Sequence, residues 1–455
     1  MKKSLDFQTY LFMFFLDSLY LLAFLFIMPY ILVRSILEPP FLRERILPRF
    51  MLPKKIRTKG PVIWIHGVSV GEILAVEAFV KELENRMPEM EIVLTTTTPT
   101  GFKVAQKTYP HHRIYYFPMD FSFLVEEMFN LVQPDMALLV ELEIWPNFVT
   151  YGKAKGVLLG VVNGRITLNS FQNYQKLGFF FRPLFQKIDF FAVQTEEYKE
   201  RFQSLGADSH KIHVLGNLKF DNLFSGNPED LAWETRKKLG LTGKELVILG
   251  GSTHSGEEEG LVEIYGRLKK KFPNLCLILA PRHPRRTPEI LKMLRAYGME
   301  WILRSQLDKN PLSWSKPPSK ILVVDTIGEL SKLYSVATLV FVGGSLIPRG
   351  GHNVLEPAAL GKTIFVGPHT FNFTKVVEFL KNHQAIEEVE DFSALEERFL
   401  HYLQNPEERK EIAQRARKAI QKSKGAVKST ADLALRLLKS TSLKKKRNQQ
   451  KSLEG

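Results

Sequence analysis

The segment PVIWIHGVSVGE, residues 61–72, contains the pattern that decides the fold. Its apolar run from Val62 to Ile65 has the length of a buried strand rather than of a helix. Gly67 then permits a tight turn. Ser69 and Glu72 have the S-x-x-E spacing of a capping box, which marks the first turn of a helix. The segment therefore predicts a buried strand, a tight turn and a helix, with a carboxylate in the first helical turn.

The same succession of a short apolar run and an amphipathic stretch recurs along the chain. Apolar runs stand at residues 62–66, 91–96, 113–117, 136–141, 156–162 and 190–194, and again at 246–252, 275–283, 321–326, 338–345 and 363–368. This alternation is typical of a parallel sheet covered by helices on both faces. A polar stretch at residues 225–245 separates the two series. We therefore predict two doubly wound α/β domains, residues 60–232 and 233–438, with a cleft between them.

An apolar segment precedes these domains. Residues 10–33 contain a single charged side chain, Asp17, and about 20 such residues suffice to cross a bilayer. Residues 34–59 contain eight basic and two acidic residues, so the positive-inside rule places that side in the cytoplasm. We predict an uncleaved single-pass membrane anchor with its basic juxtamembrane segment over residues 1–59. Asp17 and Ser18 leave open the alternative of an amphipathic helix lying in the membrane interface.

Composition narrows the classes of partner. The net charge of +15 favours anionic partners such as phosphorylated substrates or an acidic membrane surface. No zinc finger or RNA-binding signature occurs, so we expect no nucleic-acid partner. Cys276 is the only cysteine, which excludes an intramolecular disulfide and suits a reducing compartment. The tail at residues 439–455 is basic and polar, and we predict that it is disordered.

Ligands of doubly wound sheets bind beyond the carboxyl ends of the strands. The notable residues predicted at those ends are His66, Thr95–Thr98, Glu141, Asn163, Ser252, Arg282 and Gly343. Neither a G-x-G-x-x-G after the first strand nor a Walker A motif occurs, which argues against a dinucleotide-dependent dehydrogenase and a P-loop enzyme. The histidines lack metal-ligand spacing and no D-x-D pair occurs, so we expect no metal.

A glycine-rich loop gives the strongest signal in the second predicted domain. In FVGGSLIPRGGHNVLEPAALGK, residues 341–362, a strand leads through four glycines into a helix beginning near Asn353. Glycine lets backbone N–H groups approach a ligand closely, and a helix N-terminus favours phosphate. Glu356, one turn in, is a candidate acceptor for ribose hydroxyls. The structural alternative is that Asn353 and Glu356 only cap the helix.

Two further strand ends of this domain have candidate binding groups. Arg282 and His283 follow the run at 275–281, and arginine suits phosphate and carbonyl oxygens. Gly328 and Glu329 stand at another predicted helix start, where backbone N–H groups can reach a nucleotide. A solvated basic loop and a simple helical turn are the respective structural alternatives.

The first predicted domain contains three candidate catalytic groups. Glu72 is either a capping residue or a general base. In ELEIWPN we expect Glu141 and Glu143 on opposite faces, one entering the cleft and the other serving the structure. Lys219 lies near the domain boundary, where it can neutralise a phosphate or a carboxylate.

Seven segments together resemble one family. HGVSVGE, ELEIWPN, NGRI, GNLKFD, GGSTHSGEEE, PRHPRR and GGHNVLEPAALGK occur in the order in which they stand in the lipid A-specific 3-deoxy-D-manno-octulosonic acid (Kdo) transferases of glycosyltransferase family 30. The resemblance extends over about residues 60–425 and includes the N-terminal anchor. It implies a GT-B fold of two Rossmann-like domains in a protein of the inner membrane of Gram-negative bacteria.

The resemblance also assigns roles to individual residues. It implies that Glu72 is the catalytic base and that Glu141 and Lys219 stabilise the transition state. It implies contacts to the nucleotide of CMP-Kdo by Pro281, Arg282, Ile327, Gly328, Glu329, Asn353, Val354, Leu355 and Glu356. Catalysis in the family inverts the anomeric centre and needs no metal or other cofactor. The acceptor is a lipid A precursor, lipid IVA, reached from an anionic membrane surface.

The expected reaction is proton removal by Glu72 from an acceptor hydroxyl, which then attacks the anomeric carbon of Kdo and displaces CMP. The N-terminal end of a helix lowers the pKa of a carboxylate, so we expect Glu72 to be ionised at pH 7. A sugar-nucleotide epimerase and a non-catalytic membrane-bound binding protein are the competing classes. Release of CMP only when a lipid acceptor is present distinguishes a transferase from both.

Overall fold

The computed structural model describes residues 5–38, 41–56, 58, 60–223, 226–307, 314 and 321–454, with side chains up to Thr441. The chain forms two compact units. Unit 1 contains residues 1–222 and 424–455, and unit 2 contains residues 223–423. Of the basic residues expected near the membrane, Arg57 and Lys59 lie outside the described part.

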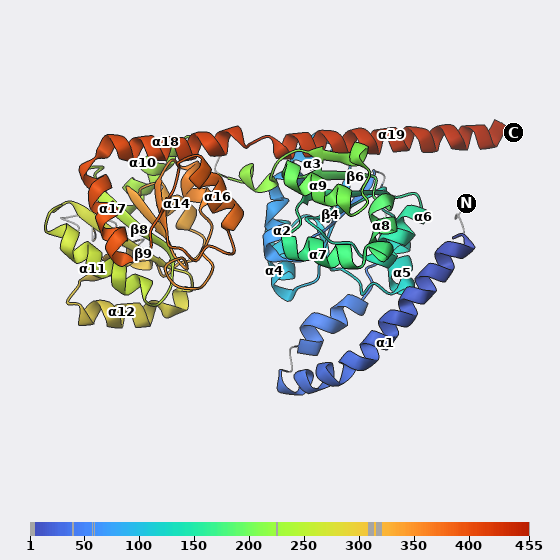
Figure 1. Cartoon of the computed structure of the whole chain (residues 1–455), viewed down its shortest axis with the longest axis horizontal. Helices are drawn as coiled ribbons and strands as arrows, with labels where there is room; N and C mark the ends of the chain where they lie inside the picture. Colours follow the sequence, from blue (N-terminus) through green and yellow to red (C-terminus); the bar gives the residue numbers. More distant parts are fainter. Residues whose placement is uncertain are drawn as a thin grey trace. The chain divides into compact units, whose positions relative to one another are not determined.

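Unit 1 is built on a seven-stranded parallel sheet with the order β3-β2-β1-β4-β5-β6-β7 (Figure 1). Each strand is followed by a helix or a helical turn, and β7 ends the series. The strands are β1 Val62–His66, β2 Glu91–Thr96, β3 Arg113–Tyr116, β4 Met136–Val140, β5 Leu158–Gly164, β6 Phe190–Val193 and β7 Ile212–Val214. The helices are α1 Phe7–Leu37, η1 Leu42–Ile46, η2 Leu47–Phe50, α2 Val70–Ala75, α3 Glu77–Arg86, α4 Pro99–Thr108, α5 Ser122–Val132, α6 Pro146–Ala154, α7 Leu168–Lys176, α8 Gly178–Lys187, α9 Glu196–Ser204, η3 Ser209–Lys211, η4 Leu218–Phe220 and α19 Ala426–Glu454.

Unit 2 has a second seven-stranded parallel sheet with the order β10-β11-β9-β8-β12-β13-β14. Its strands are β8 Leu246–Thr253, β9 Leu275–Pro281, β10 Trp301–Leu303, β11 Ile321–Val323, β12 Leu339–Val342, β13 Thr363–Val366 and β14 Glu387–Glu388. Its helices are α10 Pro228–Leu239, α11 Glu257–Lys269, η5 Pro284–Arg286, α12 Thr287–Ala296, α13 Arg304–Leu307, α14 Leu330–Tyr334, α15 Leu355–Ala359, α16 Thr374–Asn382, α17 Phe392–Gln404 and α18 Pro406–Lys422. The predicted α/β class with two doubly wound domains is confirmed.

Strand β1 shows why the sheet of unit 1 needs helices on both faces. All five of its side chains are buried, and successive side chains of a strand point to opposite faces. Trp64 packs among Phe129 and Phe148, with ring centroids 5.2 and 4.9 Å away, in the core beneath α5 and α6. Ile63 and Ile65 enter the other core, beneath α2, α3 and α19. The strand is therefore apolar from Val62 to Ile65, and its polar residue, His66, stands at its end.

The boundary between the units falls after Asn222, earlier than the predicted division after residue 232. Asn222 is bound to unit 1, because its Oδ1 accepts a hydrogen bond from the Ala78 N–H at 2.7 Å and its Nδ2 donates to the Leu74 carbonyl at 2.6 Å. The later polar residues have no such contacts to unit 1 among those that the structure describes.

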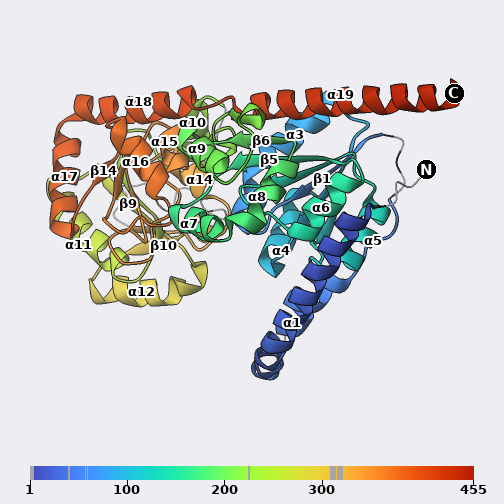
Figure 2. The ribbon, with the colours of Figure 1, turned by 45° about the vertical axis from the view of Figure 1, so that its right-hand side comes forward.

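The chain returns to unit 1 at its end, which the sequence did not indicate. Asp221 accepts hydrogen bonds from the Gly425 and Val427 N–H groups at 2.7 and 3.0 Å. Helix α19 then lies along α3 (Figure 2) and buries Ala431 and Ala434. Residues 424–438 therefore belong to unit 1 and not to the second predicted domain. The tail predicted to be disordered continues this helix to Glu454, and its many Lys, Arg, Gln and Leu residues have high helix propensity.

Helix α1 matches the predicted N-terminal apolar segment. It has 31 residues, and its most apolar 18-residue window has a mean hydropathy of 2.3 with 11% of the window buried. Among the described residues it is the one helix that is long and apolar enough to cross a membrane. Length and composition are thus compatible with a membrane anchor.

Close packing between strands gives a stability test. Gly160 lies in β5, where an added Cβ would stand 2.3 Å from the Phe190 ring and 3.0 Å from Leu138. We expect Gly160→Ala to lower the free energy of unfolding by about 1–3 kcal/mol, because overpacking forces the neighbours apart. At Gly178, in α8, an added Cβ meets nothing within 4 Å. Gly178→Ala is the matched control and should change stability by less than about 0.5 kcal/mol in denaturant unfolding. Equal losses in both variants would contradict this account.

Candidate active site

Each sheet reverses its strand order at one position, and several candidate residues follow the strands there. In unit 1 the reversal lies between β1 and β4, and in unit 2 between β8 and β12. Ligands of open α/β sheets bind at the carboxyl ends of the strands at such a reversal. Glu72 follows β1 and Glu141 follows β4, whereas His254 follows β8 and the glycine-rich loop follows β12.

Glu72 is held by the loop that precedes its own helix. Its two carboxylate oxygens accept hydrogen bonds from the Val68 N–H and the Ser69 hydroxyl, both at 2.8 Å. The Glu72 N–H donates to Ser69 Oγ at 3.3 Å, which completes the capping interaction. The hydroxyls of Thr96 and Thr98 donate to the Val68 carbonyl at 2.8 and 3.2 Å and fix the loop. The capping role is therefore present, and it leaves lone pairs of the carboxylate free for a further donor.

The electrostatic surroundings of Glu72 differ from our expectation. Burial raises the pKa of this carboxyl above its ordinary value and outweighs the hydrogen bonds from Ser69 and Val68, which favour the charged form. The charge of Glu141 raises this pKa further, and that of Lys219 opposes it. The lowering predicted from the helix terminus is thus wrong in direction. A pKa nearer to neutrality suits a general base better than that of a fully solvated carboxylate.

Glu141 is the centre of an ion-pair network that includes Lys219. Its carboxylate receives Lys219 Nζ at 3.1 Å and Arg165 Nε at 2.8 Å, and it is 13% exposed. The Glu141 backbone has a φ of 61°, which is rare for a residue other than glycine. The structure therefore brings the predicted residues Glu141 and Lys219 together, and the charges of both act on Glu72. Arg165 was not selected from the sequence, although it stands in the NGRI segment.

The expectation that Glu141 and Glu143 lie on opposite faces of a strand is wrong. Strand β4 ends at Val140, and the left-handed conformation of Glu141 breaks the alternation. Even in a continuous strand, side chains two residues apart share a face. Burial raises the pKa of Glu143 to about 8, and the charges of Glu72 and then Glu141 contribute. Glu143 therefore belongs to the same cluster of carboxylates as Glu72 and Glu141.

The surroundings of His66 and Asn163 indicate that both residues have structural roles. His66 is fully buried and its ring stacks on Phe117 at 3.8 Å. Burial lowers its pKa to about 3, so the ring is neutral at pH 7. Asn163 has a φ of 54°, and its Oδ1 accepts a hydrogen bond from the Leu218 N–H at 3.0 Å. Asn163 thereby positions the segment that contains Lys219.

The glycine-rich loop of unit 2 binds a carboxylate of its own chain. Glu257, in the first turn of α11, is 0% exposed. Its Oε2 accepts from the N–H groups of Gly344 and His254 at 2.8 and 3.0 Å, and its Oε1 accepts from those of Ser345 and Leu346 at 3.1 and 3.2 Å. Among the glycine amides that we expected to face a phosphate, that of Gly344 is therefore occupied. Gly343 is required for space, since an added Cβ would stand 2.6 Å from Thr253 Cα.

The segment Asn353–Glu356 caps the short helix α15 as the structural alternative required. Asn353 Oδ1 accepts from the Leu355 N–H at 3.0 Å, and Asn353 Nδ2 donates to Glu356 at 2.9 Å. The Ser331 hydroxyl donates to the other oxygen of Glu356. Val354 and Leu355 are buried. Only Asn353 and Glu356 therefore present polar side chains near the surface.

Arg282 and three histidines lie at the edge of the unit 2 sheet formed by the carboxyl ends of its strands. His254 and His352 stack with Nε2 atoms 2.9 Å apart, and the His283 ring lies 6.2 Å from that of His254. Burial lowers the pKa of His352 to about 4, with a smaller effect from Arg282. Arg282 is exposed and follows the buried Pro281. Sequence spacing did not reveal the pairing of His254 with His352, which are 98 positions apart.

The remaining predicted nucleotide contacts form a separate loop of unit 2. Gly328 has a φ of 90°, and the preceding Ile327 is 84% exposed. The Glu329 carboxylate accepts from Arg304 Nη2 at 2.8 Å and from the Thr326 hydroxyl. This side chain is thus already paired, whereas the Ile327 side chain faces solvent.

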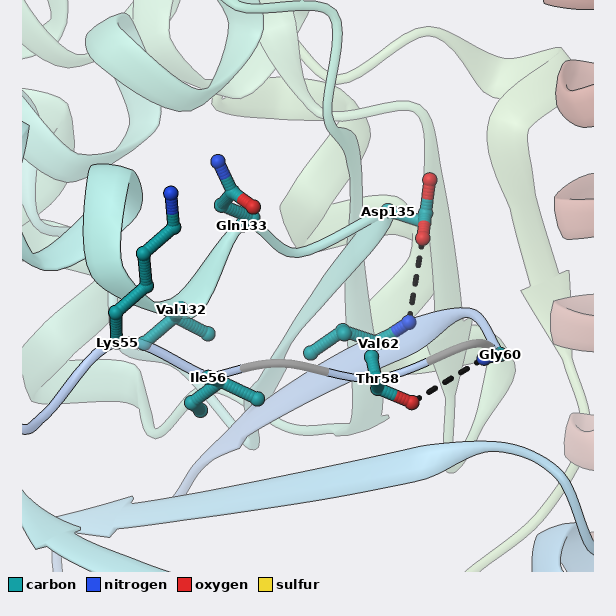
Figure 3. A pocket seen from close by; sticks show the side chains of 8 residues that line it. All are labelled: Lys55, Ile56, Thr58, Gly60, Val62, Val132, Gln133 and Asp135. Carbon is teal, nitrogen blue, oxygen red and sulfur yellow. Dashed lines mark hydrogen bonds between the residues drawn. The ribbon is translucent and has the colours of Figure 1, made fainter.

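Within the part of the chain that the structure describes, no group of three or more His, Cys, Asp or Glu side chains could hold a metal ion. A pocket lined by Lys55, Ile56, Thr58, Gly60, Val62, Val132, Gln133 and Asp135 lies at the amino end of β1 (Figure 3). Asp135 accepts there from the Val62 N–H at 3.2 Å. This pocket is at the opposite edge of the sheet from Glu72.

Substitution of Glu257 tests whether its carboxylate stabilises the glycine-rich loop. In Glu257→Gln, an amide NH₂ replaces one oxygen and leaves two backbone N–H groups without an acceptor. We expect a loss in the free energy of unfolding of about 1–3 kcal/mol for each buried donor left unpaired. Glu263→Gln, on an exposed position of the same helix, should change it by less than about 0.5 kcal/mol. Urea unfolding that gives equal midpoints for both variants would exclude the proposed role of Glu257.

Glu143 predicts a dependence of stability on pH. Its pKa is about 8 in the folded chain against an ordinary value of 4.5, so the folded state binds its proton more tightly. This contribution to stability is complete below pH 4.5 and is lost as the pH rises through 8. We expect the unfolding temperature to fall less between pH 6 and 9 in Glu143→Gln than in the parent chain. Glu127→Gln, an exposed position, is the control and should follow the parent.

Comparison with known proteins agrees with the geometry. A family model described as 3-Deoxy-D-manno-octulosonic-acid transferase (kdotransferase) matches residues 44–222. The 3-deoxy-D-manno-octulosonic acid transferase of Haemophilus influenzae is 30% identical over 423 residues, which are 92% of this chain and 97% of the relative. The enzyme of the same name from Chlamydophila psittaci is 31% identical over 382 residues, which are 82% of this chain and 84% of the relative.

Solved structures support the fold. A glycosyltransferase from Rickettsia africae has a TM-score of 0.51 at 13% identity and covers 84% of this chain and 99% of its own. UDP-GlcNAc 2-epimerase from Neisseria meningitidis also has a TM-score of 0.51, at 15% identity, and covers 80% and 99%. These likenesses concern the two-domain GT-B architecture alone. The sequence relatives are decisive, and the chain belongs to the Kdo transferases, a glycosyltransferase family of lipopolysaccharide synthesis.

Proposed function

We propose that this chain transfers Kdo from CMP-Kdo to the lipid A precursor lipid IVA, with release of CMP and inversion at the anomeric carbon. The observation that carries the proposal is the position of Glu72. It lies at the strand-order reversal of unit 1, its carboxylate is oriented by Val68 and Ser69, and its pKa is raised by burial. These are the properties of a general base for a hydroxyl group.

In this proposal the acceptor hydroxyl of a glucosamine unit gives its proton to Glu72. The oxygen forms a bond to the anomeric carbon of Kdo while the bond from that carbon to the phosphate oxygen of CMP breaks. Lys219 and Arg165 balance the charge of Glu141, so the cluster of carboxylates around Glu72 has cations beside it. Glu141 and Lys219 support the transition state through this network.

Unit 2 binds the nucleotide of the donor in the same proposal. Arg282 is exposed beside the three histidines and is suited to a phosphate. Asn353 and Glu356 meet the ribose hydroxyls, and the backbone of residues 327–329 and Pro281 contact the base. Val354 and Leu355 act through the helix whose first turn they form. The closed carboxylate site at Glu257 stabilises the loop and does not bind the phosphate.

The location and the cofactor requirement are part of the proposal. The acceptor lies in the inner membrane, and the catalytic body works on its cytoplasmic side. The apolar helix α1 and the basic residues after it are compatible with this location. The reaction proceeds without a bound metal or other cofactor, so the transfer assay below contains a chelator.

Glu72→Gln separates catalysis from capping. We expect turnover to fall about 10²–10⁴-fold, because the amide cannot accept the proton, while the unfolding temperature stays close to that of the parent. Ser69→Ala removes the cap and leaves the carboxylate. It should cost about 0.5–2 kcal/mol in stability and lower turnover far less than Glu72→Gln, because the base remains although one of its two orienting donors is lost. The measurement is the mass gain of a tetraacylated, bisphosphorylated glucosamine disaccharide incubated with CMP-Kdo and detergent-purified protein.

The outcome of that assay decides the proposal. Addition of Kdo by the parent chain and by Ser69→Ala, but not by Glu72→Gln, supports the assignment of the base. Unchanged activity in Glu72→Gln would overturn it and leave Glu72 as a capping residue. No mass gain with folded parent protein that binds CMP would overturn the acceptor.

A further inference from the structure

The single charged side chain of the apolar segment 10–33, Asp17, contacts the rest of unit 1, here called the catalytic unit, and not lipid. Asp17 accepts hydrogen bonds from the Ser122 N–H at 2.9 Å, from the Ser122 hydroxyl, and from Asn147 Nδ2 at 2.9 Å. Ser122 begins α5 and Asn147 lies in the first turn of α6. A carboxylate at the centre of a bilayer is costly. Asp17 avoids that cost because it caps the start of α5 through the Ser122 N–H and binds the Asn147 side chain at the start of α6.

The residues around Asp17 extend this contact along one face of α1. Met13 and Leu16 are 3% and 1% exposed, and the Tyr20 hydroxyl donates to Asp120 at 3.0 Å. Positions 13, 16, 17 and 20 share one face of a helix. Asp120 in turn accepts from the N–H groups of Asn147 and Phe148 at 2.9 Å each. The N-terminal half of α1 is thus docked on the start of α6.

The chain beyond α1 returns to the same place. Arg34 packs over the Phe41 ring at 4.9 Å, which joins the end of α1 to the returning segment. Arg49 then donates to the carbonyls of Phe117 and Pro118 at 3.1 and 3.3 Å, and lies over the Trp145 ring at 5.4 Å. Figures 1 and 2 show α1 leaving the domain and the blue segment after it running back. The described residues 7–38 and 41–50 therefore run out from unit 1 and back to it, and we call them the N-terminal hairpin.

This hairpin does not fit a single crossing of a bilayer. A crossing would place the start of α1 and the catalytic unit on opposite sides, but Asp17 and Arg49 bind neighbouring parts of that unit. Residues 21–37, beyond the docked face, measure only about 25 Å of helix, whereas the hydrocarbon core is about 30 Å thick. Moreover, the far end of the hairpin is charged, with Arg34, Glu38, Arg43, Glu44 and Arg45. These groups need water or lipid headgroups.

The remaining surface of the helix needs an apolar partner. Its exposed large side chains are Phe7, Tyr10, Leu11, Phe14, Phe15, Leu19, Leu21, Leu22, Leu25, Phe26, Ile27, Met28, Tyr30, Leu32, Val33, Ile36 and Leu37. Arg43 and Arg45 are exposed near its end and suit anionic headgroups, at about 1 kcal/mol each. A single leaflet supplies both an apolar interior and a charged surface.

We propose that residues 7–50 lie in one leaflet of an anionic membrane as a hairpin, with both ends on the side of the catalytic unit, and do not cross the bilayer. This topology replaces the single pass predicted from the sequence. It fixes the start of α6, and with it the loop that contains Glu141 and Glu143, at a set height above the lipid. The inference does not depend on the chemistry proposed above, because it concerns topology alone.

Cysteine labelling tests the topology on the full chain. Three reporters are exposed: Gln8→Cys before the docked face, Glu38→Cys at the charged far end, and Lys54→Cys after the return. Cys276 is 0% exposed and should not react in the parent chain. The probe is a membrane-impermeant maleimide applied to spheroplasts and to inverted vesicles. We expect all three reporters to react from the same face of the membrane.

Because Lys54→Cys marks the side of the catalytic unit, no assumption about orientation is needed. Reaction of Gln8→Cys from the opposite face would overturn the hairpin and restore the single pass. Reaction of Glu38→Cys alone from the opposite face, or no reaction there from either face, would overturn the placement in one leaflet. Since labelling does not require turnover, an inactive protein still gives a result.

A matched pair of substitutions tests the docking contact. Asp17→Leu removes the acceptor of Ser122 and Asn147, whereas Ser18→Leu makes a similar gain in hydropathy on the exposed side of the helix. We expect the unfolding temperature of the purified protein to fall by several degrees in Asp17→Leu and to stay unchanged in Ser18→Leu. Equal temperatures in the two variants would mean that Asp17 does not dock the helix.

Discussion

A parallel strand buried on both faces can carry polar side chains only at its ends, and this constraint underlies the structure. In β1, residues Val62–Ile65 alternate between two apolar cores. The first polar groups able to meet a ligand come after the strand, in the loop that contains Ser69 and Glu72. The same holds for β4, which ends at Val140 before Glu141, and for β8 and β12 in unit 2. Because the strands are parallel, their carboxyl ends share an edge, and the chemistry is confined to it.

Two glutamates at these edges show how similar local sequences lead to different roles. Glu72 and Glu257 each stand in the first turn of a helix after a strand, and both accept hydrogen bonds from backbone N–H groups. Glu257 is enclosed, with four amide donors around its two oxygens, so it stabilises the glycine-rich loop from within. Glu72 has one amide and one hydroxyl donor and is only partly buried, so it keeps acceptor capacity. The number of donors and the degree of burial, rather than the residue type, distinguish a structural carboxylate from a candidate base.

The segment Trp145–Asn147 connects the N-terminal hairpin with the candidate site. Asp17 and Asp120 bind Asn147, and Arg49 lies over Trp145. A few residues earlier, the chain leaves β4 and places Glu141 beside Lys219. The N-terminal hairpin and the cluster of carboxylates are thus attached to the two ends of one short loop, residues 141–147. In the proposed topology this loop holds Glu141 and Glu143 at a defined distance from the membrane surface.

The sequence by itself determined the α/β class, the two-domain organisation and the family, because short apolar runs and local motifs are properties of neighbouring residues. It also selected Glu72, Glu141 and Lys219 as candidates, although it assigned no contact between them. The tertiary structure decided which groups meet: Arg165 with Glu141, His254 with His352, and Glu257 with the glycine loop. It also decided that residues 424–438 pack on unit 1 and that Asp17 docks α1 on the catalytic unit. Such contacts join residues up to hundreds of positions apart, and their energies depend on burial and geometry that no local pattern encodes.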